Sequence, residues 1–355
     1  MTIRRVASVF LAALACCAAS RASLAAETRR FYQLEYALNI PSPNVPSWDY
    51  LSFDPTHNYV YIARREDGIL IYDTVAKKVI GSLPNTVGGN STTLVPELDR
   101  IFVTNGDGTL TVIQQSTLKA LKRVKVGASA DNAFYDPVTQ QLLVTMGDDR
   151  MAAFVDAKNV TLVGTLKVDS ESLEGAAPDG EGGFFLALRD RDKVVRIDVK
   201  QRQITAEIKP EKCVMPNSVA FDDANKRLLV GCRGEHPQLV VLDVGGHTVG
   251  GTNIGRGIDT IIFDAQDKRV YTANGFDGTL VILDQVDANT YKLAEAVTTR
   301  PYARTMALDP KSKKIFMACA EGTVDVAKKW KAQVTPFYPN KYFLNTFTLL
   351  TYSAR

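Results

Sequence analysis

The sequence contains few of the residues that most often carry metal, haem or acid–base chemistry. Among 355 residues there are 3 His, 5 Cys and 2 Trp. The histidines are scattered and show no zinc-ligand spacing with the cysteines, and no Cys-x-x-Cys-His stretch is present for haem attachment. A Gly-x-Ser-x-Gly motif and a glycine-rich loop opening a helix are also missing. These absences argue against zinc enzymes, c-type haem proteins, serine hydrolases and phosphate-loop proteins, and two tryptophans offer little for stacking a quinone.

Long apolar runs are missing beyond the N-terminus. Arg4 and Arg5 precede an apolar run over residues 6–19, and small residues follow up to Ala26. The run is too short to cross a hydrocarbon core of about 30 Å, and the pattern is typical of a secretory signal peptide. We therefore expect residues 1–26 to be a signal peptide and residues 27–355 to be the mature domain, located in the periplasm, with no membrane span. The alternatives are a membrane anchor or a lipid-modified Cys16 or Cys17.

The expected mature chain has no excess charge of either sign. The full sequence has 42 Lys and Arg against 39 Asp and Glu, but residues 1–26 hold Arg4, Arg5 and Arg21 and no acid. Basic and acidic residues are therefore equal in number over residues 27–355. A non-specific nucleic-acid binder is expected to be basic, so bulk charge gives no support to that role. A local basic patch is still compatible with these numbers.

A repeated unit organises the rest of the chain, and its clearest copy is Gly257–Asp284. Runs rich in Val, Ile, Thr and Tyr over residues 260–263, 269–273 and 279–283 alternate with clusters of Asp, Asn and Gly. Such short runs between turn residues predict antiparallel strands joined by hairpins. One unit is too small to bury its own faces, so the copies are expected to stack on one another.

The same register recurs at seven places, at spacings in the low forties. A period of about 40–45 residues with four strands per unit is typical of a β-propeller. We therefore predict an all-β, single-domain, seven-bladed β-propeller of four-stranded antiparallel blades. Strand-like runs over residues 31–38 and 343–352 are expected to be the outer and third strands of the last blade, which closes the ring. The seven repeat origins are Asp54, Val95, Asp136, Pro178, Asp222, Asp264 and Asp309.

The register also predicts a collar of polar side chains at one mouth of the channel. Each innermost strand should begin about five residues before its origin, so these starts converge on the axis of the ring. A small ligand held there is one explanation of their polarity, and ordinary turn-forming, solvated strand starts are the other. The expected ligand-binding residues are Asp49, Asn90, Asp131, Asn132, Glu174, Asn217, Asp259 and Arg304.

Two kinds of ligand would suit this collar. Asp131, Glu174 and Asp259 offer carboxylate oxygens for a divalent cation, Ca²⁺ or Mg²⁺, whereas Arg304 would clamp an anion. The identity of any cofactor stays open. Four arginines that follow second strands should lie around the same mouth, although an ordinary surface position is the favoured explanation for each one taken alone: Arg64, Arg65, Arg189 and Arg233.

Three cysteines follow the expected signal peptide. Cys213 lies just before the first strand of the fifth unit, and Cys232 ends its second strand. Adjacent antiparallel strands bring those ends to one edge, so a Cys213–Cys232 disulfide is expected, with two separate buried thiols as the alternative. Cys319 is expected to be a buried free thiol.

A long insertion interrupts the last unit over residues 320–342. It contains Lys328, Lys329, Trp330 and Lys331, and loops of this length in a compact domain are usually functional or disordered. Cations beside an aromatic ring could contact a nucleic acid, a glycan or a protein partner. A packed flap whose lysines face water is the alternative.

Three segments carry a resemblance to a known family: Pro216–Asp222, Gly257–Asp259 and Ala303–Asp309. They resemble the YncE-like family of exported bacterial β-propellers, also called YVTN-repeat proteins, and the resemblance extends over residues 27–355. Tyr271–Asn274 and Val103–Asn105 are the nearest echoes of the YVTN repeat itself. The resemblance implies a periplasmic seven-bladed propeller, with single-stranded DNA binding reported for the namesake.

Three functions from different classes remain at this point. The first is a non-enzymatic, monomeric binding or scaffold protein whose channel mouth recognises an unidentified small molecule or periplasmic protein. The second is a metal-dependent hydrolase or lyase resembling the propeller lactonases, which hold a cation near the channel. The third is a binder of single-stranded DNA. We expect the first.

Overall fold

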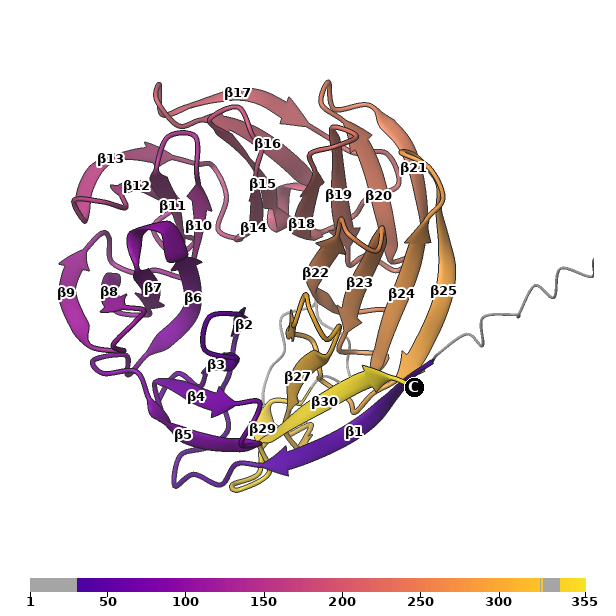
Figure 1. The fold of residues 1–355 in the computed structure, drawn as a ribbon. Helices are drawn as coiled ribbons and strands as arrows, with labels where there is room; N and C mark the ends of the chain where they lie inside the picture. The colour runs from indigo at the N-terminus through magenta and orange to yellow at the C-terminus, as the bar shows by residue number, and fades with distance from the viewer. Residues whose placement is uncertain (1–30, 326, 328–338) are drawn as a thin grey trace, which may run out of the picture. The chain divides into compact units, whose positions relative to one another are not determined.

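The computed structural model describes residues 31–325, 327 and 339–355. Within residues 31–355 these form seven four-stranded antiparallel sheets arranged in a ring (Figure 1). The only described helices are two single turns of 3-10 helix, η1 (Pro96–Leu98) and η2 (Arg189–Arg191). The predicted seven-bladed β-propeller is therefore confirmed. The expected signal peptide, residues 1–26, lies outside the described residues.

The first three blades follow one another along the chain, and each runs from its innermost to its outermost strand. Blade one contains β2 (Leu51–Asp54), β3 (Tyr59–Ala63), β4 (Ile69–Asp73) and β5 (Lys78–Ser82). Blade two contains β6 (Gly89–Val95), β7 (Arg100–Asn105), β8 (Thr109–Gln114) and β9 (Ala120–Lys125). Blade three contains β10 (Asn132–Asp136), β11 (Gln141–Met146), β12 (Met151–Asp156) and β13 (Thr161–Lys167).

Blades four to six repeat this order. Blade four contains β14 (Leu173–Pro178), β15 (Gly183–Leu188), β16 (Lys193–Asp198) and β17 (Gln203–Ile208). Blade five contains β18 (Pro216–Asp222), β19 (Arg227–Cys232), β20 (Gln238–Asp243) and β21 (Thr248–Asn253). Blade six contains β22 (Ile258–Asp264), β23 (Arg269–Asn274), β24 (Thr279–Gln285) and β25 (Tyr291–Thr298).

Blade seven is built from both ends of the described chain. Its order from the outside inwards is β1 (Tyr32–Asn39), β30 (Thr348–Ala354), β27 (Ile315–Cys319) and β26 (Met306–Leu308). As predicted, the N-terminal strand β1 is the outer strand of this blade and the C-terminal strand β30 is its third strand. However, β30 begins at Thr348 and not at residue 343 as expected. Asn345 has a positive φ of 61°, so the chain turns there before β30 starts.

The insertion in blade seven carries a small sheet of its own. β28 (Gly322–Thr323) pairs with β29 (Lys341–Tyr342) in antiparallel register. The four residues of the expected flap, Lys328, Lys329, Trp330 and Lys331, lie outside the described residues.

The hydrophobic core lies between neighbouring blades rather than at the centre of the ring. The second and third strands of each blade are mostly buried, as in β11, where all residues after Gln141 are buried. One buried cluster joins Phe102 and Val112 of blade two to Leu142 and Val144 of blade three. Stacking therefore removes from water the two apolar faces that a single blade would expose.

Two of the recurring aspartates at the inner strand ends link their blade to the next one. Gln115 Nε2 donates to Asp54 Oδ1 (2.9 Å), and Gln285 Nε2 donates to Asp222 Oδ2 (2.6 Å). In each pair the glutamine belongs to the blade that follows the aspartate's blade. The repeat origins thus mark inter-blade contacts as well as turns.

Cys213 and Cys232 form the expected disulfide, with their Cα atoms 5.3 Å apart. It ties the segment before β18 to the end of β19. Cys319 is a buried free thiol. Among the described residues, none of the helices has the length and apolar character needed to cross a membrane.

Candidate functional site

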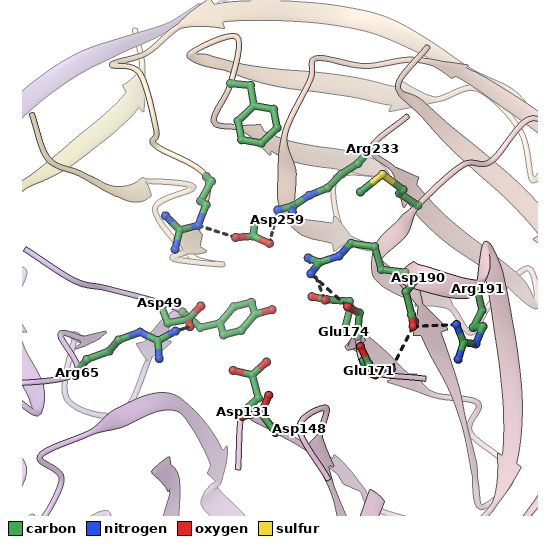
Figure 2. Close-up of a pocket in the computed structure, with 16 residues that line it drawn as sticks. Asp49, Arg65, Asp131, Asp148, Glu171, Glu174, Asp190, Arg191, Arg233 and Asp259 are labelled. Carbon is green, nitrogen blue, oxygen red and sulfur yellow. Dashed lines mark hydrogen bonds and ion pairs between the residues drawn. The ribbon is translucent and has the colours of Figure 1, made fainter. Parts of the chain in front are cut away.

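The starts of the innermost strands and the turns after the second strands meet at one mouth of the ring. They enclose a cavity of about 880 Å³ whose wall is strongly charged. Figure 2 shows carboxylates and guanidinium groups facing one another across this space. Seven carboxylates line it: Asp49, Asp131, Asp148, Glu171, Glu174, Asp190 and Asp259. Five arginines line it as well: Arg65, Arg189, Arg191, Arg233 and Arg304.

Local irregularities of the inner strands coincide with several collar residues. In β6, β18 and β22 the pairing with the second strand skips one residue, which is Asn90, Asn217 and Asp259 respectively. In β14 the register shifts between Leu173 and Ala176, a stretch that includes Glu174. A bulge leaves its extra residue unpaired and changes the direction of the side chain. The bulges therefore account for polar side chains at these positions facing the axis of the ring.

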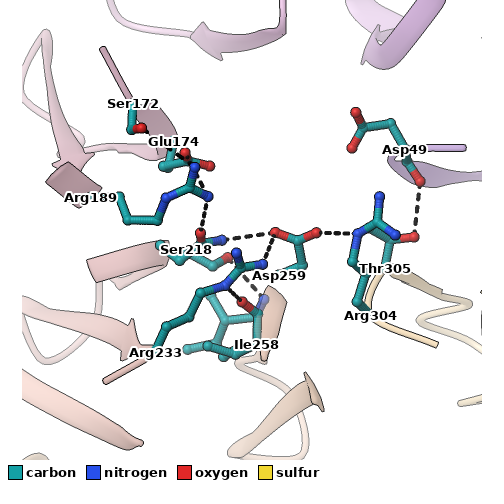
Figure 3. A network of polar contacts seen from close by, with 12 residues as sticks. Asp49, Ser172, Glu174, Arg189, Ser218, Arg233, Ile258, Asp259, Arg304 and Thr305 are labelled. Atoms are coloured by element: carbon teal, nitrogen blue, oxygen red, sulfur yellow. Dashed lines mark hydrogen bonds and ion pairs between the residues drawn. The ribbon is translucent and has the colours of Figure 1, made fainter. Parts of the chain in front are cut away.

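Asp259 is the centre of the network that holds the mouth together (Figure 3). Its Oδ1 accepts hydrogen bonds from Arg233 Nη2 (2.6 Å) and Asn217 Nδ2 (2.9 Å). Its Oδ2 accepts one from Arg304 Nε (2.7 Å). These partners come from blades five and seven, on either side of blade six. Burial raises the pKa of Asp259, but the two guanidinium groups and Asn217 outweigh it and hold the pKa below its ordinary value.

Both arginines beside Asp259 are fixed by further contacts. Arg304 Nη2 donates to the backbone oxygen of Trp48 (3.0 Å), and its guanidinium carbon lies 5.0 Å from the centre of the Trp48 ring. Arg233 Nε donates to the backbone oxygen of Ile258 (2.5 Å). Gly275 lets the chain approach Arg304 closely, because a Cβ atom there would lie 2.6 Å from Arg304 Cβ.

Arg189 extends the network towards blade four. Its Nη1 lies 2.9 Å from Glu174 Oε1 and donates to Asn217 Oδ1 (3.1 Å). Asn217 is completely buried and bridges Arg189 to Asp259. Burial raises the pKa of Glu174 even though Arg189 and Arg233 oppose the shift. Asn217 therefore positions charged neighbours rather than presenting its own amide to the cavity.

Blade one contributes a separate ion pair, between Arg65 and Asp49. The neighbouring Arg64 was expected at the mouth, but the structure buries it. Arg64 Nη2 binds Asp67 Oδ2 at 2.7 Å, and its guanidinium carbon lies 3.9 Å from the centre of the Phe347 ring. Burial raises the pKa of Asp49 to about 6, although Arg65 and Arg304 lower it.

Asp131 differs from the other collar carboxylates because its side chain has no hydrogen-bond or ion-pair partner in the described part of the chain. Burial, together with the negative charges of Asp49 and Glu174, raises its pKa to about 8. Asp148, at the turn after β11, also has no side-chain partner among the described residues and is exposed. These two carboxylates belong to the same blade and both line the cavity.

None of the three expected collar asparagines, Asn90, Asn132 and Asn217, lines the main cavity. Asn90 lines an adjoining recess of about 300 Å³ that also includes Asp131 and Asp148. Asn132 is buried, and its Oδ1 accepts a hydrogen bond from the backbone of Ala133 (2.9 Å). The side-chain oxygen of Asn132 is therefore engaged by its own strand.

Several lining residues were not predicted. Asp148 and Phe276 occupy turns after second strands, whereas Glu171 and Met215 precede innermost strands. Asp148 and Phe276 could have been predicted from the sequence in the same way as the arginines after second strands, because every residue in those turns lies at the same mouth.

The expected divalent-cation site is not favoured by these contacts. Glu174 and Asp259 face arginines, and of the three proposed ligands Asp131 alone has no side-chain partner among the residues that the structure describes. Within residues 31–325, 327 and 339–355, no group of three or more His, Cys, Asp or Glu side chains is arranged to hold a metal ion. The metal set Asp131, Glu174 and Asp259 stays a prediction.

The wall of a second cavity, at the opposite ends of the inner strands of blades one, six and seven, is mostly apolar. This cavity of about 680 Å³ is lined by Phe53, Ile262, Phe263, Met306 and Leu308, among others. Polar ligands are therefore expected at the charged mouth and not at this end.

We expect Asp259→Ala to destabilise the fold, because it leaves Arg233 and Arg304 without their carboxylate. Removing one partner of a buried ion pair costs about 3–5 kcal/mol, and partial solvation of the arginines should reduce this to about 2–4 kcal/mol. Urea unfolding of the variant measures the change. Asp148→Asn is the control and should change the free energy of unfolding by less than about 0.5 kcal/mol. Equal stability of the two variants would contradict the central role of Asp259.

We expect the Asp131 carboxyl to make stability fall as the pH rises. The folded protein keeps this proton up to about pH 8, whereas the unfolded chain loses it near pH 4. The folded state thus binds more protons in this window, so its stability is lost progressively from about pH 4 to about pH 8. The melting temperature of Asp131→Asn should equal that of the wild type at pH 4 and should exceed it by at least about 2 °C at pH 8. If the melting temperatures of the two proteins differ by the same amount from pH 4 to pH 8, the Asp131 carboxyl does not keep its proton in the folded state.

Comparisons with known proteins support the architecture alone. No family model matches the chain, and no curated protein does. Similar solved structures include the WD40 repeats of RRP9 (TM-score 0.72, 9% identity, 92% of this chain and 100% of that one) and U3-55K (TM-score 0.69, 9% identity, 90% and 98%). A chain of the mitotic checkpoint complex is also similar (TM-score 0.69, 15% identity, 89% and 96%). This protein is thus a seven-bladed β-propeller with WD40-like structural neighbours.

Proposed function

We propose that this protein is a non-enzymatic binding propeller, exported to the periplasm, that recognises a ligand or protein partner at its charged mouth. The observation that carries the proposal is the cavity of about 880 Å³, where two carboxyl groups without partners in the described part of the chain adjoin a network of fixed ion pairs. Ligand sites usually measure about 300–1,000 Å³ and hold a few well-placed polar groups.

The ion-pair network supports binding rather than a purely structural role for the mouth. Arg233, Arg304 and Asn217 hold Asp259 in place before any ligand arrives. A preorganised wall reduces the ordering that a ligand must impose, which favours affinity. Asp131 and Asp148, which take no part in the network, are available for a ligand.

The structural neighbours support a protein as one kind of partner. One of them is a chain of the mitotic checkpoint complex, so a ring of this shape serves as part of an assembly in at least that case. The resemblance to YncE-like propellers supports a periplasmic role. The Cys213–Cys232 disulfide agrees with it, because disulfides persist in oxidising compartments. No contact among the described residues favours a lactonase-type hydrolase or single-stranded DNA binding instead.

The binding role is tested by screening a small-molecule fragment library of mixed charge against the mature protein by ligand-observed NMR. Asp131→Arg places a long cationic side chain in the cavity, where Asp49 and Glu174 can neutralise it. We expect fragments that bind the wild type to lose their signals with this variant. Glu211→Gln is the matched control, because Glu211 is exposed and lies outside the cavity wall.

Two results would contradict the binding role. One is a complete lack of fragments that bind the wild type. The other is a set of fragments that bind Asp131→Arg and wild type alike, which would place binding elsewhere on the surface.

Export is tested separately, by expressing the full chain in a Gram-negative bacterium and fractionating the cells. We expect the protein in the periplasmic fraction with Glu27 as its first residue, as determined by mass spectrometry of the intact chain. Full-length protein in the cytoplasmic fraction would contradict export and leave the binding role untouched.

A further inference from the structure

We propose that the ligand of the charged mouth is an organic amine whose ammonium group binds between the Asp131 and Asp148 carboxylates. The inference rests on the proposed binding role and adds the chemical class of the ligand. It follows from which charges at the mouth are already paired and which are not.

Every arginine that lines the cavity faces a carboxylate. Arg233 and Arg304 share Asp259, Arg189 binds Glu174, and Arg65 binds Asp49. The remaining one, Arg191, contacts Asp169 and Asp190. An anionic ligand would have to compete with these existing pairs for each guanidinium group.

Two of the lining carboxylates are left over. Glu171 is paired with Arg150, which lies outside the cavity wall, whereas Asp131 and Asp148 have no partner in the described part of the chain. The carboxyl groups left for a ligand are therefore confined to blade three, and they are negative once ionised. A positively charged group is the complement of such a place.

Asn90 adds an independent observation beside these carboxylates. It is 4% exposed and lines the recess that contains Asp131 and Asp148. Its Nδ2 donates to the backbone oxygen of Ala130 (2.9 Å), whereas its Oδ1 is buried with no hydrogen-bond partner among the described residues. Buried polar atoms are rarely left unpaired. Asn90 Oδ1 thus lacks a donor beside the two unpaired carboxyl groups, and an ammonium group has three N–H donors.

The tyrosine at the centre of the acidic groups suits the same ligand. Tyr50 lines the cavity. Burial, followed by the charges of Asp259, Asp49 and Asp131, raises its pKa well above the ordinary value, so the phenol stays neutral. A neutral tyrosine ring attracts an ammonium group through its face.

The size and shape of the site favour an organic cation over a bare metal ion. A cavity of about 880 Å³ is far larger than one ion needs, and the described residues contain no cluster arranged as metal ligands. An amine on a carbon chain would place its charge at Asp131 and Asp148 and its chain in the remaining space.

Binding of the amine should depend on pH in a defined direction. Asp131 must be ionised to pair with ammonium, and in the empty site it holds its proton up to about pH 8. The facing groups that influence it are Asp49, Glu174, Asp259 and Arg65. An alkyl ammonium stays charged below about pH 10. The affinity should therefore rise by up to roughly tenfold per unit as the pH rises from 6 towards 8.

The test is isothermal titration calorimetry of the mature protein with 1,4-diaminobutane at low ionic strength. We expect saturable binding to the wild type, a loss of affinity of at least about tenfold in Asp131→Asn, and a smaller loss in Asp148→Asn. Both substitutions change a side chain that has no partner among the described residues, so the variants should stay folded. Glu211→Gln should bind as tightly as the wild type. Equal affinity of Asp131→Asn and wild type, or affinity that falls between pH 6 and pH 8, would overturn the proposal.

Three further probes separate this inference from the binding role itself. Butane-1,4-diol is a neutral analogue, succinate an anionic one and CaCl₂ a metal source. Suppose that the diol, succinate or Ca²⁺ binds the wild type but not the Asp131→Arg variant, and that 1,4-diaminobutane binds neither. The amine proposal is then wrong, whereas the binding role stands. If none of the probes binds and the fragment screen gives no signals at the mouth, both fall.

Discussion

A buried carboxylate between two guanidinium groups is the interaction on which the mouth of this ring depends. Asp259 receives hydrogen bonds from Arg233 and Arg304, which come from the blades on either side of it. Without the arginines, burial would favour a neutral Asp259, and without Asp259 the arginines would lose their shared partner. The pairing lets blades five, six and seven bring charged residues to the axis while keeping those charges compensated.

The same constraint explains why the neighbouring blades differ. Where a guanidinium group is close, as for Glu174, the carboxylate is paired. Blade three offers no such group to Asp131, so burial and nearby negative charge raise its pKa instead. One collar therefore contains a rigid arc of ion pairs and an arc whose carboxyl groups have no guanidinium partner among the described residues. The second arc is the part that a ligand can use without breaking existing contacts.

The repeat register predicted the ring and most of its collar because both follow from periodic spacing. Asp49, Asp131 and Asp259 share one position in the unit, and a shared position in a ring becomes a shared place near its axis. The bulges at Asn90, Asn217 and Asp259 were not predictable, because the extra residue shows only when both paired strands are known. The prediction that Arg64 lies at the mouth was wrong for a related reason. Its buried position depends on Phe347, which is far away in sequence, and no local pattern reveals such a contact.

The sequence also did not predict which arginine pairs with which carboxylate across the mouth. Arg304 was expected to clamp an anionic ligand, yet its contact with Asp259 joins residues of different blades. Repeat spacing shows that two side chains lie at one level of the ring. It does not show which of several neighbours a flexible arginine will choose, because that choice depends on burial and on competing carboxylates.

The construction of blade seven has a consequence for the order in which this protein can mature. β1 pairs with β30 from Tyr32 and Ala354 onwards, so the first described strand has no partner until the last one has been synthesised. The other six blades can assemble from consecutive chain, but the ring cannot close until β30 has been made.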